Sequence, residues 1–170
     1  MTAAALAPGA VDGFALRSCL ARFATGVTVI ATDGPDGRVG MTVNSFTAVS
    51  LDPPLVLVSI LKAAHRHDVL VGRPFVVNVL GAEQELLARH FAGRPLLDAV
   101  PWDERSDAPA LAGALALVEC APWATYDGGD HTLAVGRVER FSYREGDALG
   151  YFCGRFVRID APVLGIEFLY

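Results

Sequence analysis

The chain has 170 residues, a net charge of −5 and a pI near 5.3, which excludes the strongly basic surface typical of nucleic-acid-binding proteins. Hydrophobic residues make up 52% of it and charged residues 19%, a balance that favours one folded domain over a disordered chain. This apolar excess also predicts that some surface is buried between subunits. No apolar run reaches the roughly 20 residues that cross a bilayer, so we expect no membrane association.

The three cysteines lie far apart and form no C-x-x-C pair, so neither a disulfide framework nor a zinc site is predicted. His65 and His67 form an H-x-H pair without the other ligands that a metal needs. Residues 1–10 lack the basic leader and long apolar block of a signal peptide. We therefore expect a disordered tail over 1–10, a single domain over 11–170 and a cytoplasmic location.

Local patterns predict helices and strands in the first half of the chain. A helix is expected from Asp12, a capping residue, to about Ala24, because its apolar residues recur at helical spacing. Two shorter helices are expected over 64–71 and 82–91. β-Branched and apolar content predicts extended segments, separated by turn residues, over 27–31, 39–44, 45–51, 55–61 and 75–80. The segment 55–61 is almost wholly apolar, which is typical of a strand buried on both faces.

The second half is expected to be a long loop followed by strands. Residues 92–110 are rich in Pro, Asp, Arg and Gly, and a loop of this length is usually functional or mobile. Two extended runs, 111–126 and 131–143, flank Asp127-Gly128-Gly129-Asp130, which predicts a hairpin. Apolar stretches at 149–153 and 163–169 end the chain. About seven or eight mostly antiparallel strands favour a closed barrel.

Familiar nucleotide and nucleophile motifs are absent. The sequence contains no G-x-G-x-x-G, no G-x-x-x-x-G-K-[ST] and no G-x-S-x-G, so neither dinucleotide or P-loop phosphate cradles nor a serine-hydrolase elbow is predicted. The residues by themselves therefore indicate a barrel with a pocket but no particular reaction.

Two segments carry a family resemblance. Residues 22–30 read RFATGVTVI and residues 40–59 read GMTVNSFTAVSLDPPLVLVS. With further blocks at 75–80, 87–93, 129–131 and 151–156, they closely resemble the short-chain flavin reductase family, the reductase components of two-component flavin-dependent monooxygenases. The resemblance covers residues 14–158 in order. It implies a mainly β fold with short helices: an antiparallel, Greek-key-like, FMN-binding split β-barrel that forms a homodimer.

The resemblance also implies a reaction, in which NADH or NADPH passes a hydride to free FAD or FMN and the reduced flavin diffuses to a partner monooxygenase. Two alternatives stay open: a split-barrel flavoprotein that retains its flavin and acts on another small molecule, and a non-catalytic flavin or cofactor carrier. The sequence does not choose between FMN and FAD or between NADH and NADPH.

Site residues follow from the matched positions. The resemblance places the isoalloxazine against a strand end formed by Thr42, Val43, Asn44, Ser45 and Phe46. It places the flavin phosphate at a strand-to-helix junction that carries Ser59, Lys62 and His65, although relatives often have hydroxyl residues where this chain has Ala63 and Ala64. A helix N-terminus with a nearby cation suits a phosphate.

Three further groups complete the expected site. Arg89, His90 and Phe91 end a helix near the phosphate or the nicotinamide, although cations at a helix C-terminus are favourable in any case. His131, in Gly-Asp-His, is expected to orient the nicotinamide, or else only to bond the turn through Asp130. Tyr151 and Arg155 are expected to line the same groove, while Phe152 and Phe156 pack in the core. Cys153 is assigned no redox role.

Overall fold

The computed structural model describes residues 11–161. The expected tail over 1–10 and the expected strand over 163–169 lie outside these residues. Ten strands are described: β1 (Thr25–Gly26), β2 (Thr28–Gly34), β3 (Gly37–Val43), β4 (Thr47–Leu51), β5 (Pro54–Leu61), β6 (Phe75–Val79), β7 (Ala116–Gly128), β8 (His131–Tyr143), β9 (Ala148–Phe152) and β10 (Arg155–Ile159). The helices are α1 (Gly13–Leu20), α2 (His67–Leu70), the 3-10 turn η1 (Ala82–Gln84) and α3 (Glu85–Phe91).

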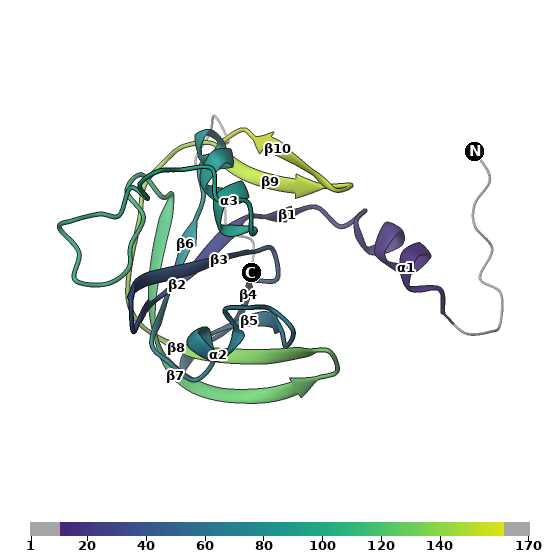
Figure 1. The fold of residues 1–170 in the computed structure, drawn as a ribbon, viewed down its shortest axis with the longest axis horizontal. Coiled ribbons are helices and arrows are strands. Elements are labelled where there is room, and N and C mark those ends of the chain that lie inside the picture. Colours follow the sequence, from purple (N-terminus) through teal and green to yellow (C-terminus); the bar gives the residue numbers. More distant parts are fainter. Residues whose placement is uncertain (1–10, 162–170) are drawn as a thin grey trace.

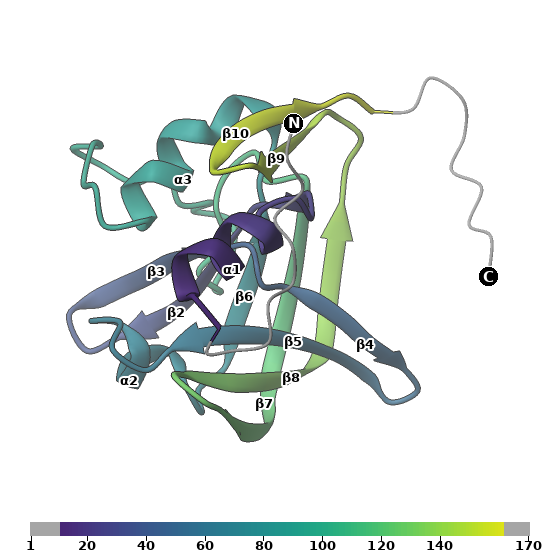
Figure 2. The same cartoon turned by 90° about the vertical axis from the view of Figure 1, so that its right-hand side faces the viewer.

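Seven strands form one antiparallel sheet in the order β3-β2-β6-β7-β8-β5-β4. The first and last strands of this order, β3 and β4, are connected directly by residues 44–46, so the sheet curls into a barrel (Figures 1 and 2). Its interior is filled by apolar side chains such as Ile30, Val58 and Val77. The predicted mainly β, antiparallel barrel is therefore confirmed.

Most of the predicted strands are found, but β7 begins at Ala116 and not at residue 111, and β1 was not expected. Strand β5 is not buried on both faces: Val56, Val58 and Ile60 are buried, whereas Leu55 and Leu57 between them are only half-buried. This alternation arises because one face of β5 points into the barrel and the other away from it. Strand β10 was not expected as a separate strand. Its exposed and charged residues hide the pattern of a hairpin with β9.

A small sheet in the order β1-β9-β10 covers one end of the barrel beside α3 (Figure 2). Between them lies a second apolar cluster that includes Val27, Leu80, Leu87 and Leu149. Phe156 packs against this cluster as expected, but Phe152 is 40% exposed and the expectation that it packs in the core is wrong. Residues Thr25 to Thr28 connect this sheet to the barrel.

Polar contacts with the barrel hold the long loop over 92–110, which has no helix or strand. The backbone N–H of Leu111, just after the loop, donates to the buried side-chain oxygen of Asn78 (2.7 Å). The Arg38 guanidinium donates to the carbonyl oxygen of Ser106 (2.9 Å) and lies over the Trp102 ring. These contacts attach the loop to the barrel wall.

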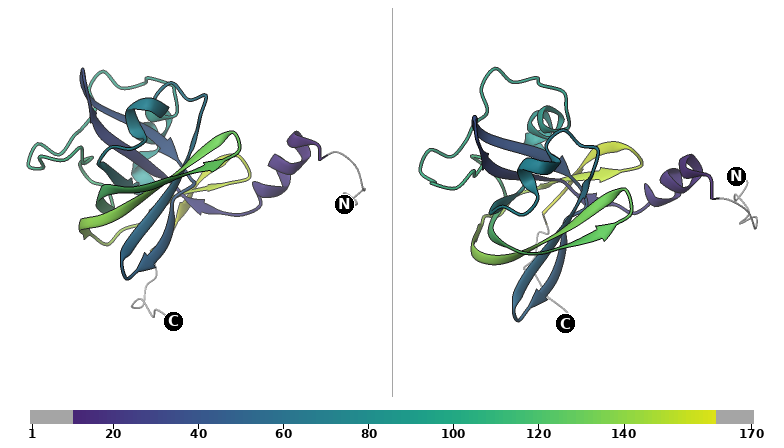
Figure 3. Two further views of the ribbon diagram at one scale, coloured as in Figure 1. Left: turned by 90° about the horizontal axis from the view of Figure 1, so that it is seen from below. Right: turned by 60° about the horizontal axis from the view of Figure 1, so that its bottom comes forward.

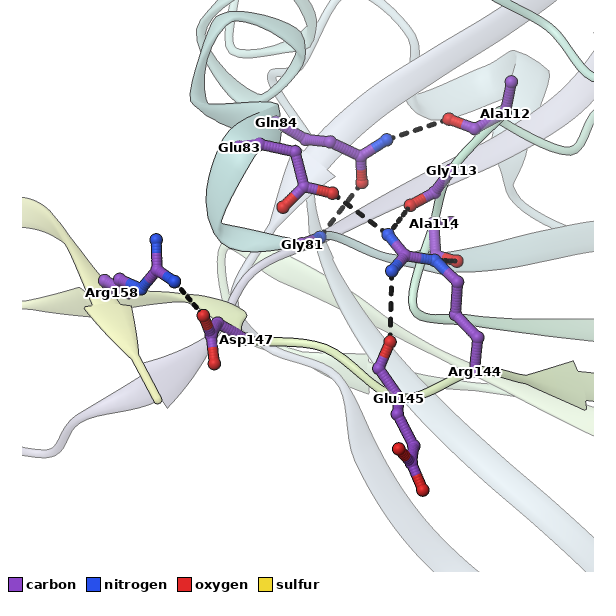
Figure 4. Close-up of polar contacts among 10 residues, drawn as sticks. All are labelled: Gly81, Glu83, Gln84, Ala112, Gly113, Ala114, Arg144, Glu145, Asp147 and Arg158. Carbon is purple, nitrogen blue, oxygen red and sulfur yellow. Dashed lines mark hydrogen bonds and ion pairs between the residues drawn. The ribbon is translucent and has the colours of Figure 1, made fainter. Parts of the chain in front are cut away.

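Arg144, which follows β8, ties the end of the barrel to η1 and so to α3 (Figure 4). Its guanidinium donates to the backbone oxygens of Gly113, Ala114 and Glu145 and to the carboxylate of Glu83. Five-donor guanidinium groups suit such convergent acceptors. The position of α3 relative to the barrel is thereby fixed, which matters because α3 contributes to the site.

Helix α1 extends away from the barrel (Figures 1 and 3). Asp12 caps it as predicted, accepting from the N–H of Phe14 (3.0 Å). The helix ends at Leu20 and not near Ala24, because the chain has turned toward β1 at Thr25. None of its residues is buried, and Phe14 is 81% exposed. Among the described residues, no helix is long and apolar enough to cross a membrane.

Candidate active site

A cavity of about 640 Å³ lies between the end of β3, helix α3 and the β9–β10 hairpin. It brings together six of the predicted site residues: Thr42, Val43, Asn44, Arg89, Tyr151 and Arg155. These residues come from three distant segments of the chain, so only the fold makes them neighbours. The cavity volume falls within the range usual for small-molecule sites.

The end of β3 is fixed by its contacts with α3. The Thr42 hydroxyl donates to the carbonyl oxygen of Ala88 (2.7 Å). Two residues before Thr42, Gly40 leaves room for Phe91: a Cβ at Gly40 would lie 2.9 Å from Phe91 Cε1. Phe91 also packs against Trp102. Phe91 therefore supports the cavity wall and does not itself line the cavity.

The other two residues of the predicted isoalloxazine strand end face elsewhere. The Ser45 hydroxyl bonds both backbone groups of Ser59, and Phe46 packs against the barrel core. Neither Ser45 nor Ser59 lines the cavity. Asn44, in contrast, is exposed to the cavity, and its side chain makes no hydrogen bond within residues 11–161.

The predicted phosphate junction is not part of this cavity. Lys62 donates to the Asp127 carboxylate (3.0 Å) and to the carbonyl oxygen of Gly129 (2.6 Å), both in the β7–β8 hairpin. His65 is exposed in the turn before α2. Helix α2 begins at His67 and has no side-chain cap. With four residues it offers too little helix dipole to make a strong anion site.

The two predicted site residues Arg89 and His90 of α3 have different positions: one lines the cavity and the other does not. Arg89 lines the cavity, pairs with Glu85 (2.6 Å) and lies 5.2 Å from the Phe156 ring centroid. His90 does not line it. Its Nδ1 accepts from the N–H groups of Leu96 (3.1 Å) and Leu97 (3.2 Å), so it secures the chain after the helix.

His131 begins β8, at the tip of the β7–β8 hairpin. Its Nδ1 lies 2.6 Å from Asp130 Oδ1, the turn contact that was expected as the alternative to a nicotinamide role. This contact lowers the pKa of Asp130 below its ordinary value. The hairpin tip and the β9–β10 turn project toward the same side of the barrel (Figure 1). The His131 side chain is 37% exposed and does not line the cavity.

Sequence reasoning missed five residues that line the cavity: Val27, Ala92, Arg94, Gly154 and Phe156. Arg94 is the most informative of them. It follows Gly93, whose φ of 86° reverses the chain after α3, and its N–H donates to the carbonyl oxygen of Arg89 (3.2 Å). A second arginine only five residues after Arg89 is the feature of the sequence that could have identified it. The side chains of Arg94 and Arg155 have no acidic partner within residues 11–161.

These residues fit a flavin nucleotide. Arg94 and Arg155 provide guanidinium groups for a phosphate. Asn44 offers both a donor and an acceptor to a polar ring edge, and Tyr151 offers an aromatic surface. A second cavity of about 650 Å³, lined in part by Asn44, Tyr151 and α1, adjoins the first. No cluster of three or more metal-ligating side chains occurs among the residues that the structure describes.

Comparison with known families decides the classification. The sequence model of the flavin reductase like domain matches residues 20–160. This chain belongs to the flavin reductase-like family. The match includes every predicted site residue and all the residues that line the cavity.

Individual family members agree with this assignment. The chain is 43% identical to the FMN reductase (NADH) of Agrobacterium fabrum over 157 residues, 90% of each chain. It is 39% identical to the reductase component of 4-hydroxyphenylacetate 3-monooxygenase of Thermus thermophilus over 150 residues, 87% of this chain and 97% of that one. The solved NADH:FAD oxidoreductase of Streptomyces globisporus superposes with a TM-score of 0.82 at 42% identity, covering 93% and 98% of the two chains.

Proposed function

We propose that this protein is an NADH-dependent flavin reductase, which transfers a hydride from NADH to free FMN or FAD and releases the reduced flavin. One observation carries the proposal: the strand end Thr42–Asn44, within the family match, forms one wall of a cavity. Its other walls carry Arg94 and Arg155, which have no acidic partner within residues 11–161. Similarity to NADH-dependent FMN and FAD reductases supports the same reaction.

The roles of the site residues are part of this proposal. Asn44 and the backbone of Thr42 and Val43 hold the polar edge of the flavin ring, and Tyr151 contacts a ring face. Arg94 and Arg155 bind the phosphate, with Arg89 oriented beside them by Glu85. The bound flavin supplies the hydride-accepting chemistry. His131 orients the nicotinamide. It is not needed as a general base, because hydride transfer depends mainly on the placement of the two rings.

We also propose a homodimer. Large apolar side chains are exposed on α1 and the segment that follows it, on β4 and on the end of β8, among them Phe14, Phe23, Leu51, Phe141 and Tyr143. This many large apolar side chains exposed on one chain favours burial of some of them between subunits. Light scattering on the purified protein tests this directly, and a monomer at micromolar concentration would contradict it.

The natural recipient of the reduced flavin is a separate monooxygenase, as the name of the Thermus thermophilus relative indicates for that protein. A cytoplasmic location belongs to the same proposal. Three unpaired cysteines, Cys19, Cys120 and Cys153, are compatible with a reducing compartment.

The test is the loss of NADH absorbance in air with catalytic amounts of protein and excess FMN or FAD, with NADPH and riboflavin as comparison substrates. We expect oxidation that saturates with added flavin and a preference for NADH. The protein should purify with little bound flavin. Tightly bound yellow flavin without turnover on added flavin would instead favour a retained-flavin enzyme or a carrier.

A further inference from the structure

Lys62 is the only lysine in the chain, and all its polar contacts are with one turn. Its Nζ donates to the carbonyl oxygen of Gly129 (2.6 Å) and to Asp127 Oδ2 (3.0 Å). Its backbone N–H donates to the carbonyl oxygen of Asp130 (2.9 Å). The single residue thus contacts three of the four residues that form the tip of the β7–β8 hairpin.

This turn would otherwise leave acceptors unpaired. Gly128 and His131 are the last paired residues, and Gly129, with a φ of 77°, begins the two-residue connection. The second carboxylate oxygen of Asp127 accepts from the Gly129 N–H (2.8 Å). The Asp127 carboxylate therefore accepts from the Gly129 N–H, and the Lys62 ammonium donates to the Gly129 carbonyl oxygen. The carboxylate and the ammonium also bond each other.

The same turn determines where the His131 ring lies. The backbone of His131 is paired with Gly128 on one side and with Leu61, the neighbour of Lys62, on the other. Its Nδ1 is bonded to the Asp130 carboxylate (2.6 Å). An ionised carboxylate only accepts, so Nδ1 carries the proton and Nε2 is the nitrogen left for a ligand. The ring orientation thus depends on Asp130, which directly follows Gly129, the residue whose carbonyl oxygen accepts from the Lys62 side chain.

We propose that Lys62 is a positioning residue: it fixes the turn that carries Asp130 and His131, so that the His131 imidazole keeps one orientation toward the nicotinamide. This inference rests on the proposed flavin reductase function. It replaces the expectation that Lys62 binds the flavin phosphate. A phosphate would have to compete with both Asp127 and the Gly129 carbonyl, whereas Arg94 and Arg155 already line the cavity without acidic partners.

Comparison of FMN with riboflavin separates the two roles, because riboflavin has the same ring without the phosphate. For Lys62→Met we expect the turnover number with NADH to fall about 10-fold with either flavin, the effect of losing alignment. The ratio of the FMN and riboflavin KM values should stay within about twofold of the original. A loss confined to FMN, seen as a raised KM with unchanged turnover, would overturn the proposal and restore the phosphate role.

A double-mutant cycle tests whether Lys62 acts through the hairpin. Asp127→Asn should reproduce part of the Lys62→Met loss, and the double variant should lose little more than Lys62→Met alone, since coupled partners are not additive. Additive losses would contradict the mechanism. Arg140→Met is the matched control, because it removes the Arg140–Glu119 pair (2.6 Å) from the other end of the same hairpin. Arg140→Met should leave the turnover number and the ratio of the FMN and riboflavin KM values unchanged.

A readout independent of activity distinguishes this inference from the proposed function. Long-range 1H–15N NMR reports the protonated nitrogen of each of the four histidines, with His131→Gln assigning one signal. We expect a fixed Nδ1–H ring at His131 in the original protein and an averaged ring in Lys62→Met. An unchanged His131 signal in Lys62→Met would refute the positioning role. An inactive original protein with the expected NMR change would refute only the flavin reductase assignment and, with it, the nicotinamide as the ring's target.

Discussion

The Ser45 hydroxyl donates to the carbonyl oxygen of Ser59 (2.8 Å) and accepts from the N–H of the same residue (3.1 Å). One side chain therefore takes the place of a backbone pair between the β3–β4 junction and β5. Because Asn44 precedes Ser45, this contact also holds Asn44 at the cavity wall. Barrel closure and site geometry thus depend on the same hydroxyl.

Ser45→Ala should destabilise the protein by about 1–3 kcal/mol, since two half-buried backbone groups of Ser59 lose their partner. Flavin binding should weaken with it, because Asn44 loses its support. Urea unfolding and flavin titration measure the two effects. Ser18→Ala, which removes an exposed helix hydroxyl contact to the Phe14 carbonyl, is the control and should change neither measurement appreciably.

Gly40→Ala should cost about 1–3 kcal/mol of stability, the usual cost of overpacking. A Cβ at Gly40 would lie 2.9 Å from Phe91 Cε1 and 3.0 Å from Val29 Cγ1. Moving Phe91 displaces the end of α3 and with it Arg89, so flavin affinity should fall as well. Gly13→Ala, where nothing lies within 4 Å of the added carbon, should be neutral. Equal unfolding midpoints for the two variants would show that Phe91 can move aside without loss of stability.

Arg155→Met and Arg94→Met should each raise the Kd for FMN about 10-fold, because a charge-assisted contact to the phosphate is lost. Their Kd for riboflavin should change little. Quenching of flavin fluorescence gives both values. Arg105→Met, which alters an arginine of the long loop paired with Asp103, serves as the charge-matched control. If riboflavin binding fell as much as FMN binding, these arginines would be contacting the ring and not the phosphate.

The pH dependence of stability should include a contribution from Asp147. A hydrogen bond from the Ala161 N–H and the nearby Arg158 guanidinium lower the pKa of this carboxyl from its ordinary value of 3.8. A group whose pKa is lower in the folded state stabilises the protein above its unfolded pKa, and this contribution is lost as pH falls through the folded value. Asp147→Asn should therefore be less stable than the original protein at pH 7, with the gap closing below about pH 4. A gap independent of pH would contradict this account.

Cys120 should resist thiol reagents in the folded protein. Burial raises the pKa of its thiol to about 12, so the reactive thiolate is scarce at neutral pH. Cys19 is exposed and should react first with iodoacetamide, followed on unfolding by Cys120. Peptide mapping by mass spectrometry after brief labelling assigns the sites. Rapid labelling of Cys120 under native conditions would mean that this part of the barrel opens readily.

The sequence by itself determined most of the strands, the β7–β8 hairpin and the family. These features have local causes: β-branched runs favour extended chain, and Gly129 permits the positive φ that its turn requires. The strand-end segment at 42–44 could be assigned to the site because its motif is contiguous. The same local reasoning failed for β5, since a continuous apolar run does not reveal whether one face or two will be covered.

Only the tertiary structure decided which cations belong to the cavity. Lys62 finds its acceptors 65 and 67 positions along the chain, while Arg94 and Arg155 converge from the segment after α3 and from β10. A long charged side chain reaches any acceptor within several ångströms, so its partner is set by strand register and not by its neighbours in sequence. The sequence therefore supplied the chemistry of the site, and the closing of the barrel determined which residues share it.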